Sequence, residues 1–310
     1  LHTGLERQKN RQNWVNRDYM DSPEKQSIKH TFDHGLEYIR KNADEDNWFL
    51  QIETFDPHEP FFTQEEFQDL YPHEYDGPAF DWPPYREVRE DDLTVEHIRY
   101  MYAALVTYCD QQLGRVLDVF DKHDLWQDTM LVVNTDHGFL MGEHDWWAKV
   151  VTPFFQEVAH IPFWVYDPRH PDCVGETRDS VVQTIDLPPT ILDYFDIPAT
   201  RDMQGKSLTG AMLNDEPVRE AALYGVMGGQ VNVTDGQYVY MRGNVTEDNS
   251  PLFEYTLMPT HMNSLFSVRE LSSWEKFEDF SFTKACPVMQ IPSRTPRFLL
   301  ARDNPYGKGR

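Results

Sequence analysis

The sequence is poor in cysteine, in long apolar runs and in positive charge, and each shortage excludes a class of protein. Its 310 residues include three cysteines without a C-x-x-C spacing, so neither a disulfide framework nor a zinc knuckle is indicated. No apolar run approaches the roughly 18 residues of a membrane span. Lys and Arg number 28 against 52 Asp and Glu, a net charge of −24. Nucleic acids and anionic membranes both need a basic surface, so we expect neither as a partner.

The bulk composition is that of a soluble globular protein, with 40% hydrophobic and 26% charged residues. The sequence opens at Leu1 rather than at methionine, so a cytoplasmic and an exported location both stay open. An acidic surface repels anionic esters at long range. Any such substrate would therefore need a locally cationic pocket.

Hydrophobic periodicity predicts strands and long helices in alternation over the first two thirds of the chain. Strands are expected at residues 48–55, 129–133 and 161–166, and helices at 30–41, 92–123, 181–186 and 189–195. This alternation is typical of an α/β fold with a doubly wound, mostly parallel sheet.

The pattern of predicted secondary structure changes after about residue 210. Short strand-like runs separated by Gly, Asn and Asp occur at 222–226, 237–242 and 252–257, and a helix is expected at 268–277. We therefore predict two domains. Residues 1–210 would form an α/β domain and residues 211–310 a small antiparallel α+β subdomain.

Residues 134–149 carry the strongest chemical signal. Asp136 and His137 directly follow a buried strand, where ligands bind in open α/β sheets. A carboxylate oxygen and an imidazole nitrogen can bind one metal ion. Lys149 follows thirteen residues after Asp136, beyond a glycine-containing loop, and could return to the same pocket as a point charge for an anionic substrate. On spacing alone, these residues could equally belong to a turn.

The pattern Asp136-His-Gly-x-x-x-Gly-Glu-His-x-x-x-Ala-Lys149 resembles the second signature of the sulfatase family, within the alkaline phosphatase superfamily. Other blocks resemble the same family in the same order: residues 49–60, which end in P-H-x-P, the helix at 102–117, the H-x-P entry at His160, and residues 184–208. Iduronate-2-sulfatase-like sulfatases and phosphonate monoester hydrolases share the spacing from Asp to Lys. The resemblance implies an alkaline phosphatase-like fold, of which this chain would be an incomplete, C-terminal portion.

The resemblance also implies roles for individual residues. Asp136 and His137 would coordinate a divalent metal ion. Lys149 and His58 would be catalytic and would bind the ester oxygens, with His58 as general acid or anion ligand. His144 would bind substrate at the edge of the pocket, with a purely structural hydrogen bond as the alternative.

Two further residues of these blocks have expected roles in the scaffold. Glu143 is expected to fix the loop, and His160 is expected to be a core histidine.

Calcium is the metal that the resemblance favours, with manganese or magnesium as alternatives. Family members mostly use calcium where Asn follows the Asp of the signature. The histidine at position 137 instead makes manganese or another nitrogen-tolerant ion more plausible.

The family's nucleophile is absent from this sequence. It is a Cys or Ser in C/S-x-P-x-R, converted to formylglycine, and an Asp-Asp pair of metal ligands precedes it. Residues 290–294 imitate the motif with Gln290 at the nucleophile position, and Asp91-Asp92 is better explained as a helix start. We expect a missing N-terminal segment, or a separate chain, to complete the site; alone, this chain would be inactive.

Three functions are therefore compatible with the sequence. The first is a metal-dependent sulfuric ester hydrolase acting on a small anionic ester, such as a sulfated sugar or an aryl sulfate. The second is a phosphonate or phosphate diester hydrolase on the same scaffold, since both ester classes make similar electrostatic demands. The third is a non-catalytic relative or fragment. The long connection at residues 61–91 is the expected place of substrate specificity.

Overall fold

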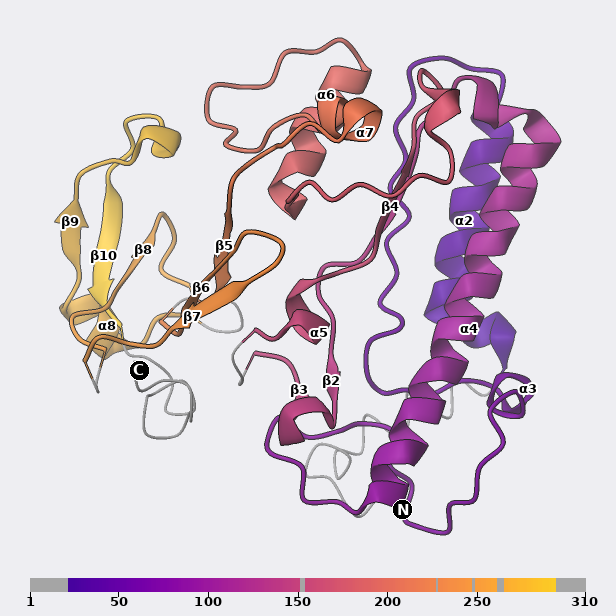
Figure 1. Ribbon diagram of the computed structural model, residues 1–310. Coiled ribbons are helices and arrows are strands. Elements are labelled where there is room, and N and C mark those ends of the chain that lie inside the picture. Colours follow the sequence, from indigo (N-terminus) through magenta and orange to yellow (C-terminus); the bar gives the residue numbers. More distant parts are fainter. Residues whose placement is uncertain (1–21, 151–153, 227, 247–248, 261–264, 294–310) are drawn as a thin grey trace. The chain divides into compact units, whose positions relative to one another are not determined.

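The computed structural model describes residues 22–150, 154–226, 228–246, 249–260 and 265–293 (Figure 1). These residues divide into two compact units. The first holds the described residues up to Lys149 together with His160–Val174, and the second holds Val150, 154–159 and the described residues from Gly175 onward. The predicted domain boundary at residue 210 remains a prediction. Among the described residues, no helix has both the length and the apolar character needed to cross a bilayer.

Two long helices, α2 (Ser27–Asn42) and α4 (Asp92–His123), pack side by side in the first unit (Figure 1). The apolar spacing of the sequence predicted both. Asp91 caps α4, because its carboxylate accepts a 2.9 Å hydrogen bond from the backbone N–H of Thr94. The helix ends at Asp124, whose φ of 58° is left-handed. The expected helix start at Asp91-Asp92 is thus confirmed.

The strands of the first unit are short and antiparallel. β1 (Leu131–Asn134) pairs with β4 (Phe163–Tyr166), with Leu131 opposite Tyr166. The predicted doubly wound, mostly parallel sheet is not confirmed, since every strand pair in the described part of the chain is antiparallel. A parallel connection needs a crossover, usually a helix. Between β1 and β4 the described chain forms only the short strands β2 (Leu140–Met141) and β3 (Trp147–Ala148), the turn η4 (Glu143–Asp145) and the four-residue α5 (Gln156–Ala159).

The strand predicted at residues 48–55 is wrong, although the pattern behind it is real. Even-numbered side chains from Trp48 to Thr54 are half-buried, and odd-numbered ones from Phe49 to Phe55 are exposed. Ile52 packs closely on α2, where a Cβ on Gly35 would lie 2.5 Å from its Cδ1. The segment is extended, but it pairs with no strand that the structure describes.

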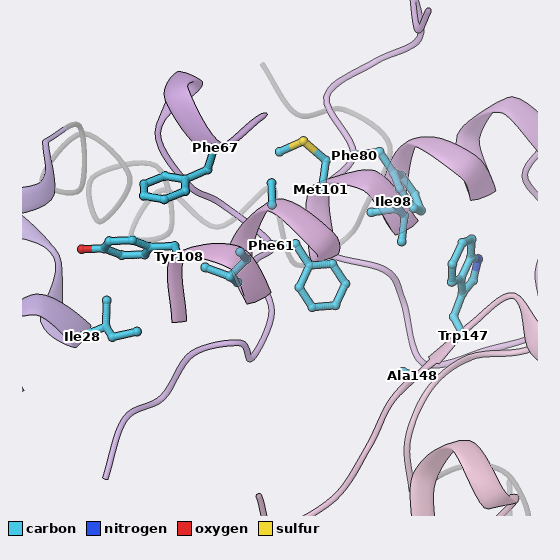
Figure 2. Packing of buried hydrophobic residues seen from close by; sticks show 11 residues of the cluster. Ile28, Phe61, Phe67, Phe80, Ile98, Met101, Tyr108, Trp147 and Ala148 are labelled. Carbon is cyan, nitrogen blue, oxygen red and sulfur yellow. The ribbon is translucent and has the colours of Figure 1, made fainter. Parts of the chain in front are cut away.

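The long connection at residues 61–91 is ordered and supplies much of the core of the first unit. It contains the short helix α3 (Glu65–Gln68) and presses its aromatic side chains onto α4 (Figure 2). The cluster comprises Ile28, Phe61, Phe67, Phe80, Ile98, Met101, Ala104, Leu105, Tyr108, Trp147 and Ala148.

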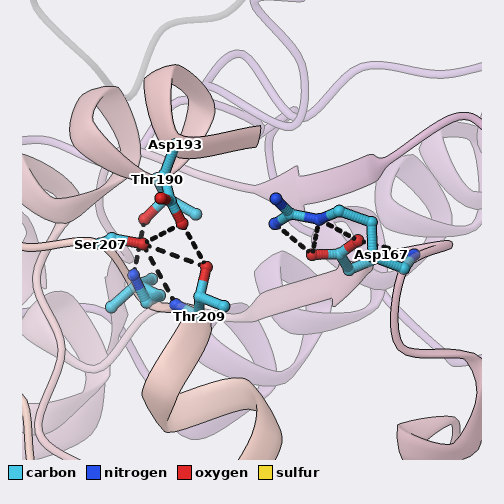
Figure 3. Close-up of polar contacts among 7 residues, drawn as sticks. Asp167, Thr190, Asp193, Ser207 and Thr209 are labelled. Carbon is cyan, nitrogen blue, oxygen red and sulfur yellow. Dashed lines mark hydrogen bonds and ion pairs between the residues drawn. The ribbon is translucent and has the colours of Figure 1, made fainter. Parts of the chain in front are cut away.

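The second unit begins with a helical segment held by polar contacts rather than by a large apolar core. Its helices are η6 (Thr184–Asp186), α6 (Leu187–Tyr194) and α7 (Thr209–Asn214). The helix expected at 181–186 is only a single turn, because Asp186 draws the chain into a capping box with Gln183. Thr190 accepts a 3.0 Å hydrogen bond from the N–H of Leu208, and Asp193 accepts hydrogen bonds from Ser207 and Thr209 (Figure 3).

Two small antiparallel sheets follow, where the sequence predicted one small antiparallel subdomain. One has the order β5 (Ala222–Gly225), β6 (Val231–Thr234), β7 (Val239–Arg242), and the other β8 (Phe253–Thr256), β10 (Val288–Pro292), β9 (Glu275–Phe277). The helix expected at 268–277 ends early as α8 (Val268–Ser272). The remaining single-turn helices are η2 (Pro23–Lys25), η3 (Leu125–Gln127), η5 (Pro171–Cys173) and η7 (Ser281–Thr283).

Candidate active site

A short hairpin explains the thirteen-residue spacing between Asp136 and Lys149. β2 and β3 pair with Leu140 opposite Ala148 and Met141 opposite Trp147. The same register places Lys149 opposite Phe139, and the Lys149 ammonium lies 5.8 Å from the centre of the Phe139 ring. The hairpin therefore returns the lysine to the chain segment that directly follows Asp136 and His137.

The hairpin is anchored to α4 at its turn. Gly142 has a φ of 97°, and a Cβ there would lie 2.8 Å from the side chain of Val95, so both the backbone and the packing require glycine. Arg99 donates a 2.9 Å hydrogen bond to the carbonyl of Met141 and forms an ion pair with Glu143. Glu143 also accepts a 2.6 Å hydrogen bond from the N–H of Met141. The predicted loop-fixing role of Glu143 is confirmed.

Asp136 and His137 present two electron-rich atoms side by side. The Nδ1 atom of His137 lies 2.9 Å from the carbonyl oxygen of Gly138. A carbonyl can only accept, so Nδ1 carries the proton and a neutral ring exposes the lone pair of Nε2. Nε2 lies 3.4 Å from Oδ2 of Asp136, whose side chain is 82% exposed. A cation bound between the two atoms would make that approach favourable.

This pair fits a divalent metal ion as part of a larger ligand set. Metal-binding histidines commonly donate their other ring N–H to a backbone carbonyl, as His137 does here. The described part of the chain holds no group of three or more His, Cys, Asp or Glu side chains placed to hold a metal ion. Hard divalent ions normally take six or more oxygen ligands. The two residues would therefore supply only a share of the coordination shell.

His58 lies in the proline-rich turn that ends the extended segment. Its Nδ1 is 2.7 Å from the carbonyl oxygen of Glu59, and its ring packs on Phe55 with centroids 4.4 Å apart. The carbonyl holds the proton on Nδ1 by the same argument as for His137. Nε2 of His58 is therefore the atom that takes up a proton when the ring is neutral and releases it when the ring is doubly protonated.

Sequence reasoning missed the residue that joins His58 to Lys149. The side chain of Glu59 is fully buried, and its Oε2 lies 3.2 Å from Nδ1 of His58 and 3.7 Å from the Lys149 ammonium. Its Oε1 accepts a 2.6 Å hydrogen bond from the hydroxyl of Tyr85, in the long connection. The available signal was an acid between two residues of the P-H-x-P block, a position that the motif leaves open.

Two other histidines lie at the surface. His144 sits at the tip of the hairpin, at the end away from Phe139, with a left-handed φ of 55° and an exposed side chain. Its assignment to the pocket edge stays a prediction. His160 is also exposed, so the prediction of a core histidine there is wrong. It precedes β4 in a turn, where the side chain is not drawn into the sheet.

A half-buried acid lies two residues before His58. Burial raises the pKa of Asp56 to about 6. Burial likewise raises the pKa of the Cys109 thiol to about 12, with the charge of Asp56 as a second cause. All three cysteines, Cys109, Cys173 and Cys286, are free, as the absence of a disulfide framework in the sequence predicted.

Two family models match the chain. The sulfatase model matches residues 3–197, and the model of the C-terminal region of N-sulphoglucosamine sulphohydrolase matches residues 142–271. The second match begins inside the hairpin and runs through the segment that the structure places in the second unit.

Curated relatives agree with these matches. An arylsulfatase of Clostridium perfringens is 25% identical over 63% of this chain and 44% of its own length. Human iduronate 2-sulfatase is 29% identical over 53% of this chain and 34% of its own length. An ulvan-active sulfatase of Formosa agariphila is 26% identical over 88% of this chain and 55% of its own length. The chain thus spans between about a third and about half of these relatives.

Solved structures support the fold. The phosphonate monoester hydrolase of Silicibacter pomeroyi superposes with a TM-score of 0.58 at 17% identity, over 72% of this chain and 56% of that protein. The corresponding enzyme of Agrobacterium radiobacter gives a TM-score of 0.57 at 18% identity, over 71% of this chain and 53% of that protein. The likeness to these structures concerns architecture, whereas the sulfatase model covers well over half of the sequence. On that match, together with the signature from Asp136 to Lys149, this chain belongs to the sulfatase family.

Proposed function

We propose that the protein containing this chain hydrolyses sulfate esters. The observation that carries the proposal is that Lys149 and the imidazole of His58 both lie beside one buried carboxylate, that of Glu59. The Lys149 side chain is only 8% exposed. This places a positive charge and a proton-transfer group together on a protein whose net charge is −24. With His58 doubly protonated, as the reaction requires, these side chains together carry a net positive charge, which is what an anionic ester requires.

Each residue has a distinct task in this proposal. Lys149 stabilises negative charge on the sulfate oxygens, and its interaction is strong because the ammonium is shielded from water. His58, when doubly protonated, gives the proton on Nε2 to the oxygen of the departing alcohol, while Nδ1 stays held by the Glu59 carbonyl.

Two parts of the machinery lie partly or wholly outside these residues. Asp136 and His137 would hold a divalent ion, calcium in the first instance, which when bound supplies a positive charge beside the ester. The nucleophile is proposed to be the family's formylglycine, carried on a segment beyond these 310 residues.

The substrate is proposed to be a sulfated sugar or an aryl sulfate. Relatives of this chain carry names such as N-acetylglucosamine-6-O-sulfatase, ulvan-active sulfatase and arylsulfatase, which favours esters of sulfate over esters of phosphorus. The connection at residues 61–91, tied to the site through Tyr85, is the proposed determinant of the choice among them.

The test is a substrate comparison with the complete protein. We expect hydrolysis of para-nitrophenyl sulfate, with a kcat/KM at least about 100-fold above that for the matching phenylphosphonate ester. A reversed preference would make the protein a phosphonate or phosphate diester hydrolase instead. Hydrolysis of neither ester, nor of sulfated mono- and disaccharides, would identify a non-catalytic relative.

A further inference from the structure

Glu59 is the most deeply buried charged side chain near the proposed site, and no role follows for it from the signature or from the chemistry above. Its side chain has no exposed surface, and it lies directly after His58 in the turn. A buried carboxylate is unfavourable unless cations or hydrogen-bond donors surround it. The groups around the Glu59 carboxylate therefore indicate its role.

The two carboxylate oxygens of Glu59 face different groups. Oε1 accepts the 2.6 Å hydrogen bond from the Tyr85 hydroxyl, which fixes the rotation of the carboxylate. Oε2 accepts no hydrogen bond from the described residues, although it lies 3.2 Å from Nδ1 of His58 and 3.7 Å from the Lys149 ammonium. The oxygen is thus held between the two groups that would contact the ester, and it is bonded to neither.

We propose that Glu59 is a positioning residue for the hydrolysis, an inference that rests on the proposed function. Its carbonyl and Oε2 both face the Nδ1 side of the His58 ring, which leaves Nε2 as the atom that delivers the proton. Its negative charge holds the Lys149 ammonium beside that ring. The proposed nucleophile forms a bond to sulfur while the bond between sulfur and the ester oxygen breaks. The ester oxygen keeps the electron pair of the broken bond and takes the proton from Nε2, and His58 is left neutral with its Nδ1 proton in place.

This role makes a prediction that a purely structural role does not. A leaving phenol with an electron-withdrawing nitro group departs readily as an anion, whereas unsubstituted phenol needs the proton. Loss of positioning must therefore slow phenyl sulfate more than para-nitrophenyl sulfate. Loss of structural integrity would slow both esters by the same factor.

The experiment compares both esters in the complete protein and its Glu59→Gln variant. We expect kcat for phenyl sulfate to fall by about 100-fold and kcat for para-nitrophenyl sulfate to fall by about tenfold or less. Glu59→Asp, which keeps the charge, should recover part of the loss on phenyl sulfate. An equal loss on both esters, or no loss on either, would overturn the positioning role.

Glu90→Gln is the matched control. Glu90 is a half-buried carboxylate on the same framework, but its partners are Trp147 and Arg86. We expect this variant to lose stability while the ratio of the two rates stays that of the parent. A change of that ratio equal to the change in Glu59→Gln would also overturn the inference.

Two further arrangements keep the test decisive. If Glu59→Gln does not fold, Tyr85→Phe removes only the anchor of Oε1 and should give a smaller selective loss on phenyl sulfate; an unselective effect would count against the inference. If the unaltered complete protein hydrolyses sulfated sugars but no aryl ester, the same comparison is made between a sugar sulfate and its fluorinated, more acidic analogue. Absence of all sulfate ester hydrolysis would overturn the proposed function itself, and is distinct from an active parent with unselective variants.

Discussion

Phe139 and Lys149 lie opposite each other at the open end of the β2–β3 hairpin, with the lysine ammonium 5.8 Å from the ring centre. The aromatic face and the buried surroundings keep water from the cation, and its charge is therefore poorly screened. A lysine so enclosed is costly to the fold unless it contacts an anion, as it does at Glu59.

We expect Lys149→Ala to lower kcat/KM for a sulfate ester by about 100-fold or more, since a preorganised charge at the reacting group commonly contributes that much. The bound metal content should stay unchanged, because Lys149 is not a proposed ligand. The comparison is with Lys41→Ala, because the Lys41 side chain is 70% exposed on α2 and forms an ion pair with Glu37 in the same helix. Unchanged turnover in Lys149→Ala would remove this residue from the site.

Asp136→Ala should abolish stoichiometric divalent metal in the complete protein, as measured by elemental analysis after dialysis. The carboxylate is the only hard oxygen donor of the Asp136–His137 pair, and its loss leaves one nitrogen. Asp44→Ala, an exposed acid beyond the end of α2, is the control and should retain the metal. Full retention of metal in Asp136→Ala would contradict the ligand assignment.

The half-buried carboxyl of Asp56 predicts a specific pH dependence of stability. Burial raises its pKa from 3.8 to about 6, so the folded state binds the proton more tightly than the unfolded state does. The contribution of this group to the free energy of unfolding is complete below pH 3.8 and is lost as the pH rises through about 6. Asp56→Asn should therefore raise the unfolding free energy at pH 7.5 relative to the parent protein, and much less at pH 4.

Urea unfolding at both pH values measures this effect. Asp110→Asn replaces an exposed acid of α4 and should show no comparable difference between the two pH values. If Asp56→Asn destabilised the protein more at pH 7.5 than at pH 4, the ionised carboxylate would be the form that the fold uses.

The ion pair between Asp186 and Arg219 predicts a large loss of stability in the second unit. Asp186 has no exposed side-chain surface and accepts hydrogen bonds from both terminal nitrogens of Arg219 and from the N–H groups of Gln183 and Lys206. Burial alone would raise the pKa of Asp186, but these donors outweigh it and hold the pKa below its usual value. Arg219→Met would leave this buried charge without its cation, at a cost of about 3 kcal/mol or more.

The exposed pair of Arg201 and Asp202 offers a matched comparison. The arginine side chain is 79% exposed and the two groups are 3.4 Å apart. Arg201→Met should cost less than about 1 kcal/mol in urea unfolding. Equal costs for the two substitutions would show that the buried pair adds nothing special to the stability of this unit.

The sequence predicted the elements whose stability is local. The bounds of α4 follow from its apolar spacing and from the cap at Asp91, which depend on neighbours within a few turns. Residues 48–55 carry the alternation of a strand, but a strand also needs a partner, and pairing depends on residues far away in the chain. The antiparallel pairing of β1 with β4 could not be predicted from the sequence for the same reason.

The residues of the candidate site likewise fall into some that the sequence predicts and some that it does not. Asp136, His137, Lys149 and His58 were predicted because they occupy fixed positions of known motifs, and their roles stay predictions. Glu59 stands at a motif position that admits any residue, and its importance comes from burial between groups 1 and 90 positions away in the sequence. Tyr85 lies in the long connection at residues 61–91, and hydrophobic periodicity does not predict the path of such a connection.

The register of the hairpin has a consequence for how this region can change in length. Residues added at the tip, near His144, would lengthen the loop beyond the Met141–Trp147 pair and leave Lys149 opposite Phe139. A single residue added between Trp147 and Lys149 would instead turn the lysine to the other face of the ribbon and away from Glu59. Variation among natural homologues should therefore collect at the tip, where insertions are tolerated, while the number of residues on either strand stays constant.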